Sequence, residues 1–215
     1  MYALPGRRTI PSSPLTRRHT IASLALTRIA FSHVAVPKLR AAAFLTARIA
    51  HGGAAALLPG PAGLTLDGSF VGMTALPACA PGAHFDVALG VDERVRVTYA
   101  APVGRARAPG LLAREHAVRY ERRVRVRSSR AGATHLTVRD QVPVCADERC
   151  RVVVVAPAGL RAVGDEVALP DGGRAGLAEG GEVWYRLEVG KGAEVALALE
   201  YEVRTPAGAV VCSKW

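Results

Sequence analysis

The sequence predicts an all-β protein, built as an antiparallel β-sandwich or as two packed sub-sandwiches, with little helix. Three observations lead to this prediction. Apolar and polar residues alternate with a period of two along several segments, 22 glycines and 14 prolines punctuate the chain, and no long segment shows a convincing helical period of 3.6 residues. The chain has 215 residues, half of them hydrophobic, which is enough to bury a sizeable core.

The sharpest local pattern is an Asp-Gly dipeptide between two apolar runs. Asp67-Gly68 separates Leu64–Leu66 from Ser69–Val71. A two-residue hairpin turn favours Asp-Gly because both of its positions need positive φ. We therefore expect a tight hairpin here. The earlier segment Thr20–Val36 fits both a helical and a strand pattern, so we assign it to neither.

Longer strands are expected in the second half of the chain. Apolar residues alternate with charged or small ones along Val118–Arg127, Val183–Val189 and Val195–Val203. We interpret the last two segments as a hairpin around Gly190–Gly192. Shorter strands are expected at Phe85–Leu89, Val95–Tyr99, His135–Val138 and Arg151–Val155.

The domain organisation follows from composition. The length fits one large or two small domains, and no repeat and no flexible low-complexity linker divides the chain. The stretch 100–110 is rich in Pro, Gly and Arg, so we expect a long loop or an internal seam there.

The net charge of +10 is concentrated in the first 66 residues, which contain eight basic residues and no Asp or Glu. An acid-free N-terminus also fits an organelle transit peptide, but Pro5, Pro11 and Pro14 interrupt the amphipathic helix that such a peptide needs. We therefore predict a cytoplasmic protein, with organelle targeting as the alternative. No apolar segment is long and clean enough for a membrane span.

One expected strand carries a row of arginines on its polar face. Arginines on a strand could follow a phosphate backbone, but sheets that bind nucleic acids interleave aromatic residues for base stacking. Tyr120 falls on the opposite face. We therefore expect a solvated face and no nucleic-acid partner; the row comprises Arg119, Arg123, Arg125 and Arg127.

The motifs that carry common chemistries are absent from the sequence. It contains no phosphate-binding loop, no dinucleotide-binding glycine motif, no nucleophile elbow and no paired-histidine zinc motif. Cys145 and Cys150 have a spacing that could close a short loop, but no second Cys or His pair completes a zinc site. We interpret the cysteines as buried or idle thiols, and we predict no catalytic residue, no metal and no cofactor.

Several short sequence motifs, taken together, resemble those of a known family. In this order and spacing they resemble the C-terminal domain of unknown function (number 4139) of mucoidy inhibitor A-like proteins, in its fungal-type branch. The likeness covers Leu4 to Gly208, and it implies that residues 1–215 form a single domain of this family. The motifs are Val36–Leu39, Ala43–Arg48, Leu57–Ala62, Leu66–Gly72, Leu89–Asp92 and Asp140–Val144, followed by Asp147–Arg149.

The resemblance supplies family-motif positions but no catalytic residue. Cys145 and Cys150 depart from the family pattern, in which serine and an aliphatic residue are usual. The motif positions have structural explanations in turns and strand ends, and we assign them a structural or an interaction role. They are Asp67, Gly68, Gly90, Asp92, Asp140, Gln141 and Pro143.

The resemblance also implies a longer parent protein. Family members typically carry an N-terminal domain and a coiled-coil segment ahead of this region, and the likeness is already under way at Leu4. We therefore expect this chain to be an N-terminally truncated fragment. Its expected partner is an unknown protein or the missing N-terminal and coiled-coil part, and an unpaired sheet edge would favour self-association.

Three functions from different classes fit these observations. The leading one is a non-enzymatic β-sandwich module that acts through contacts with another protein. The alternative is a carbohydrate-binding or carbohydrate-active domain, which is weakened because Trp184 and Trp215 are the only tryptophans available for stacking on sugars. The third is a hydrolase without a recognisable motif.

Overall fold

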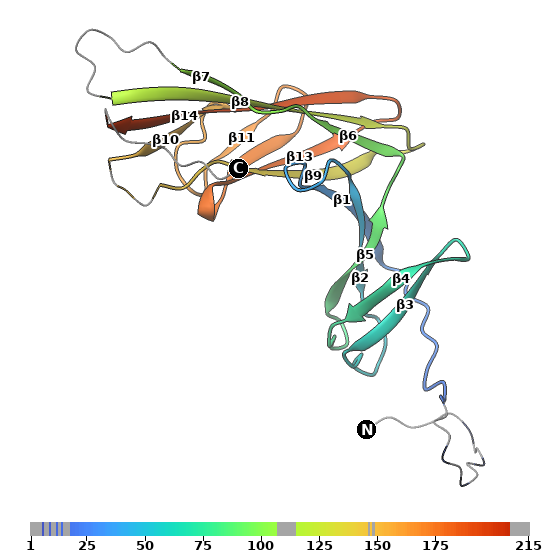
Figure 1. Cartoon of the computed structure of the whole chain (residues 1–215). Coiled ribbons are helices and arrows are strands. Elements are labelled where there is room, and N and C mark those ends of the chain that lie inside the picture. The colour runs from blue at the N-terminus through green and yellow to red at the C-terminus, as the bar shows by residue number, and fades with distance from the viewer. Residues whose placement is uncertain are drawn as a thin grey trace. The chain divides into compact units, whose positions relative to one another are not determined.

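The computed structural model describes residues 18–106, 115–145, 147 and 149–206, and nearer the N-terminus residues 6, 9, 12 and 14. Nearly all regular structure in these residues is β-strand, and the only helix among them is the short 3-10 turn η1 (Glu179–Gly181). The predicted all-β fold is therefore confirmed (Figure 1).

The strands follow one another along the chain with short connections. In order they are β1 (Ile29–Ala35), β2 (Phe44–Ala50), β3 (Gly60–Leu66), β4 (Ser69–Leu76), β5 (His84–Val91), β6 (Val95–Tyr99), β7 (Val103–Ala106), β8 (Glu115–Ser128), β9 (Thr134–Gln141), β10 (Arg151–Ala156), β11 (Glu166–Ala168), β12 (Arg174–Leu177), β13 (Glu182–Val189) and β14 (Glu194–Pro206).

The chain divides into two compact units. Unit 1 comprises Met1–Phe31 and Ala47–Leu89, and unit 2 comprises Ser32–Thr46 and Gly90–Trp215. The described part of the stretch 100–110 contains β7, and residues 107–110 lie outside the described residues. The expectation of a single domain with a seam at this stretch stays a prediction.

Unit 1 contains the predicted Asp-Gly hairpin. Strands β3 and β4 pair antiparallel, with Leu66 opposite Ser69. The two turn residues have positive φ, 49° at Asp67 and 79° at Gly68, which is what a two-residue turn of this kind requires. A small core of Cys79, Phe85 and Val87 lies in the same unit.

Unit 2 is a β-sandwich. One sheet has the strand order β11-β12-β13-β9-β1-β2, and the other has the order β10-β14-β8-β6 with β7 also paired to β8. Among the described residues, the pairings between these strands whose register is defined are antiparallel, except the parallel pair β1–β9. Aliphatic residues from both sheets form one core, among them Leu136, Val138, Val183, Val124, Val126 and Leu199.

The predicted hairpin of Val183–Val189 with Val195–Val203 is wrong. Strand β13 pairs with β9 and β12, whereas β14 pairs with β8 and β10 in the facing sheet. Both strands bury their apolar residues in the same core from opposite sides, and the Tyr185 hydroxyl reaches across to donate to the Ala198 carbonyl at 3.2 Å. The connection at residues 190–193 is therefore a corner between sheets.

The other expected strands are found with shifts of a few residues at their ends. The sequence pattern leaves the segment Thr20–Val36 undecided between helix and strand. Its residues 29–35 form β1, and residues 18–28 lie in neither helix nor strand. The arginines expected on the polar face of β8 are exposed, in agreement with the predicted solvated face.

Candidate functional site

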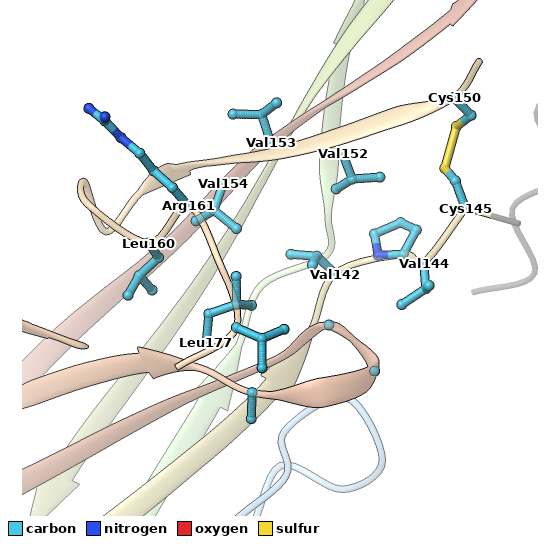
Figure 2. A pocket seen from close by; sticks show the side chains of 15 residues that line it. Val142, Val144, Cys145, Cys150, Val152, Val153, Val154, Leu160, Arg161 and Leu177 are labelled. Atoms are coloured by element: carbon cyan, nitrogen blue, oxygen red, sulfur yellow. A yellow bond between two sulfur atoms is a disulfide. The ribbon is translucent and has the colours of Figure 1, made fainter. Parts of the chain in front are cut away.

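An apolar pocket with a volume of about 600 Å³ lies in unit 2 (Figure 2). Four segments surround it: the chain that leaves β9 at Val142–Cys145, strand β10 with Cys150 before it, residues 160–163, and residues 177–181. Of the described residues that line the pocket, Arg161 is the only charged one. Aliphatic side chains dominate the lining, and Val144 and Val163 are 68% and 61% exposed.

Two family-motif residues help to form one wall of this pocket: Pro143 is part of the wall, and Gln141 supports it. Pro143 lines the pocket directly. The Gln141 side-chain amide donates to the Gly180 carbonyl at 2.9 Å, and the Val142 backbone N–H donates to the Gly181 carbonyl at 2.8 Å. These two hydrogen bonds tie the end of β9 to the glycine turn that lines the pocket beside it.

Gly181 is required at this junction. Its φ is +74°, a conformation that residues with a side chain rarely adopt, and an added Cβ would lie 2.6 Å from the carbonyl oxygen of Val142. A side chain here would push the wall and the turn apart. The shape of the pocket therefore depends on a glycine at this position.

A buried ion pair lies behind the same wall. Arg122 Nη1 donates to Asp140 Oδ1 at 2.7 Å and to the Gln141 carbonyl at 2.9 Å, and Nη2 donates to the Tyr201 hydroxyl at 3.0 Å. The Arg122 and Asp140 side chains are 1% and 2% exposed. Because charge-assisted hydrogen bonds inside a protein are strong, this group fixes the position of the β9 end.

The protonation states of this group follow from its surroundings. Burial lowers the pKa of Arg122, but the charge of Asp140 and the neighbouring tyrosines outweigh it, so the pKa lies above its ordinary value. Burial raises the pKa of Tyr201 to about 12, although Arg122 opposes this shift. At neutral pH the arginine is therefore charged and the tyrosine hydroxyl is neutral.

Cys145 and Cys150 form a disulfide at the edge of the pocket, with a Cα–Cα distance of 5.9 Å. The expectation of idle thiols is wrong for these two residues, because the turn at Asp147, whose carbonyl accepts from the Cys150 N–H at 2.9 Å, brings them together. Cys79 is free and buried, as predicted. Cys212 lies outside the described residues.

Asp92, a further family-motif residue, organises a second polar group in unit 2. Its carboxylate accepts from His33 Nε2 at 2.8 Å, from the Arg94 backbone N–H at 3.1 Å and from Arg130. Burial raises the pKa of Asp92, but these hydrogen bonds and the charge of Arg130 outweigh it and lower the pKa below its ordinary value. His33 is buried, and Asp92 itself lines a second pocket of about 470 Å³. The His33–Asp92 pair therefore joins β1 to the residues that follow β5 and borders this second pocket.

The seven predicted motif positions fall into three groups. Gln141 and Pro143 lie at the pocket wall with Asp140 behind it, and Asp92 belongs to the second polar group. Gly90, two residues before Asp92, lies in β5 and has a φ of 94°. Asp67 and Gly68 form the hairpin turn of unit 1.

Arg122 was not predicted, although the sequence contains a signal for it. In an alternating strand whose residues Tyr120 and Val124 point inward, residue 122 points inward as well. An arginine at an inward position indicates a buried ion pair, since an unpaired charge there would be very costly. The partner, Asp140, lies 18 residues further along the chain and could be found only from the fold.

Three observations bear on other kinds of site. The Trp184 ring lies where a Cβ on Gly176 would project, and the Arg186 guanidinium is 4.2 Å from the ring centroid, so this tryptophan is already engaged within the chain. The described residues contain no group of three or more His, Cys, Asp or Glu side chains that could hold a metal ion. Among the same residues no helix has the length and apolar character that a bilayer span requires.

The fold and the site define an all-β protein whose sandwich carries an aliphatic pocket. The chain belongs to the family described as a domain of unknown function (DUF4139), which it matches over residues 1–207. The predicted domain family is therefore confirmed, while the mucoidy inhibitor A-like parent and the fungal-type branch stay predictions.

One curated relative shows how much of a longer protein the chain corresponds to. The chain is 26% identical to Protein F37C4.5 of Caenorhabditis elegans over 175 residues, which is 81% of this chain and 31% of that protein. The chain thus spans about a third of the length of this relative. No solved structure is significantly similar to the chain.

Proposed function

We propose that unit 2 is a non-enzymatic interaction module that binds an apolar segment of another protein in the pocket between β10 and the chain that leaves β9. The observation that carries the proposal is the lining itself. It consists mainly of aliphatic side chains, three of which, Val144, Val153 and Val163, are between 44% and 68% exposed. An exposed aliphatic surface of this kind is typical of protein interaction sites.

The chemistry of the pocket supports binding rather than catalysis. A catalytic pocket gathers several convergent polar or titratable groups, whereas the only charged group among the described lining residues is that of Arg161. The buried Arg122–Asp140 pair supports the wall from behind and does not line the pocket. Within a longer mucoidy inhibitor A-like protein, the bound segment would come from the remaining part of that protein or from a separate partner.

A selection from a random peptide library tests this function. The whole chain is immobilised, and enriched peptides are then measured against two variants by fluorescence anisotropy. Val144→Asp places a charge in the pocket, and Leu39→Asp changes an exposed leucine that does not line it. We expect binding to be lost in Val144→Asp and kept in Leu39→Asp. Equal binding to all three proteins, or no enrichment at all, would contradict the proposal.

The disulfide bears on the proposed cytoplasmic location. Disulfides persist in oxidising compartments and are rare in the cytosol. If the protein is cytoplasmic, the Cys145–Cys150 disulfide of this structure is therefore expected to be kept reduced inside the cell. Rapid alkylation during lysis, followed by mass spectrometry, distinguishes this state from the oxidised pair expected in the organelle alternative.

A further inference from the structure

We propose that the occupant of the pocket binds as an extended strand that adds to the open edge of β10, with aliphatic residues on one face and an acidic residue on the other. This inference rests on the proposed function, since it names the partner chemistry of the same pocket. It is argued from the position of β10, from its sequence and from the charges beside it.

Strand β10 lies at the edge of its sheet. It pairs with β14 on one side, and the sheet order ends there. Among the described residues, no backbone hydrogen bond joins 151–156 to a segment other than β14. In an antiparallel pair, alternate residues of an edge strand direct their N–H and C=O groups away from the partner. The edge of β10 therefore offers a row of backbone donors and acceptors along 151–154, before the register shift that the pairing with β14 makes between Val154 and Ala156.

The pocket lies along this edge. Three consecutive residues, Val152, Val153 and Val154, line it, although successive side chains of a strand point to opposite faces. Figure 2 shows Val152 and Val154 on the side of β10 where Val142 lies, and Val153 on the other side. A cavity that contacts both faces of one strand borders the edge of that strand, so an occupant would lie beside the β10 backbone.

The sequence of β10 is unusual for an edge strand. Residues 151–156 read Arg-Val-Val-Val-Val-Ala, a nearly continuous apolar run of β-branched residues. Such a run is typical of a strand that is covered on both faces, and edge strands are normally protected by charges or proline. None of these residues is fully buried in this structure. An added strand would cover this run.

The charges beside β10 define the partner. Arg151 is exposed and has no ion pair among the described residues. Its cross-strand neighbour on β14 is Arg204, which pairs with Glu202. Like charges directly opposite each other are unfavourable, and opposite charges are favourable. An acidic residue on the added strand, opposite Arg151 on the outer face, would offset the repulsion between Arg151 and Arg204. The inward residues of the added strand would fill the aliphatic pocket.

The test uses the whole chain and four synthetic peptides of nine residues, with affinities measured by calorimetry. The first peptide alternates valine and glutamate, the second has lysine in place of glutamate, and the third has serine in place of valine. The fourth is the first peptide with alternate backbone nitrogens methylated, which removes the hydrogen-bond donors of one edge. The protein variants are Arg151→Glu and, as a matched control, Arg125→Glu on an exposed position of β8.

We expect the valine–glutamate peptide to bind. Methylation should lower the affinity of this peptide about tenfold, because two or three hydrogen bonds are lost. Arg151→Glu should weaken the same peptide about fivefold and favour the lysine peptide, since a cross-strand charge pair contributes at most about this much. Arg125→Glu should leave the preference unchanged. The serine peptide should not bind.

Two results would overturn the proposed occupant, and the first of them leaves the proposed function intact. One is equal binding of the methylated and unmethylated peptides that is still lost in Val144→Asp, which would show an apolar site without backbone pairing. The other is a concentration-dependent dimer of the chain that is lost in Val153→Lys, which would make a second copy the occupant. If no peptide binds and Val144→Asp changes nothing in the library selection, both proposals are wrong.

Discussion

Arg122 on β8 and Asp140 on β9 join the two sheets of the sandwich through a buried ion pair, with 2.7 Å between Nη1 and Oδ1. The same guanidinium donates a hydrogen bond to the Gln141 carbonyl. The Gln141 side-chain amide in turn donates to the Gly180 carbonyl, in the turn that lines the pocket. The interior of the sandwich and the wall of the pocket are therefore connected through two adjacent residues, Asp140 and Gln141.

Removing one partner of this pair should be costly. We expect Arg122→Met to lower the free energy of unfolding by about 3–5 kcal/mol, because it leaves a buried carboxylate without its counter-charge. Adding Asp140→Leu to this variant should restore part of the loss. Arg125→Met, on the exposed face of the same strand, should change stability by about 0.5 kcal/mol or less. Urea unfolding at pH 7 measures all three, and equal effects of the two single variants would contradict the role of the pair.

Gly181→Ala should distort the pocket wall. The added Cβ meets the Val142 carbonyl oxygen at 2.6 Å and also forces alanine into a left-handed conformation. We expect a loss of about 2 kcal/mol or more. Gly180→Ala is the matched control, because its φ of +68° carries the same strain but nothing lies within 4 Å of the new Cβ. If thermal unfolding shows the two variants to be equally stable, the close contact at Gly181 is not real.

Gly68→Val should destabilise unit 1 through the turn alone. Its φ of +79° is strained for valine, while nothing lies within 4 Å of the added Cβ. We expect a loss of about 1 kcal/mol or more. Gly60→Val in β3 also adds a side chain into open space, but without positive φ, and it should cost less. Denaturation midpoints compare the two, and an unchanged midpoint for Gly68→Val would count against the turn.

Asp92 should make stability depend on acid pH. Its pKa is lower in the folded chain than in the unfolded chain, so its stabilising contribution is complete above about pH 4 and is lost as the pH falls through the folded pKa. Asp92→Asn should therefore be less stable than the parent at pH 7, and the difference should shrink as the pH is lowered toward 2. Asp171→Asn removes an exposed carboxylate with no ion pair among the described residues and serves as the control. A difference at Asp92 that does not change with pH would refute this linkage.

Local patterns were sufficient for the strands and for the Asp67-Gly68 turn, because alternation and turn chemistry are properties of neighbouring residues. Pairing between strands is different. Strands β13 and β14 alternate in the same way and follow each other closely, yet they lie in facing sheets. Period two indicates which residues are buried but not which strand lies alongside, so the hairpin prediction failed.

The candidate site was only partly accessible from the sequence. Asp140, Gln141 and Pro143 stood out as family-motif positions, but their common location at a pocket depends on the turn at Gly180–Gly181, which lies about 40 residues away. The pocket itself is a gap between two sheets, and no local pattern encodes such a gap. Arg122 could have been noticed from its inward position on β8, although its partner could not.

The most direct test of the account is a map of the bound state. Backbone amide chemical shifts of the isotope-labelled chain are measured while a library-selected peptide is added. The account predicts that the perturbed amides gather at the pocket, on Val142–Cys145, on β10 and around Gly181. Perturbations gathered instead around Asp92, or in unit 1, with the pocket amides unchanged, would contradict it.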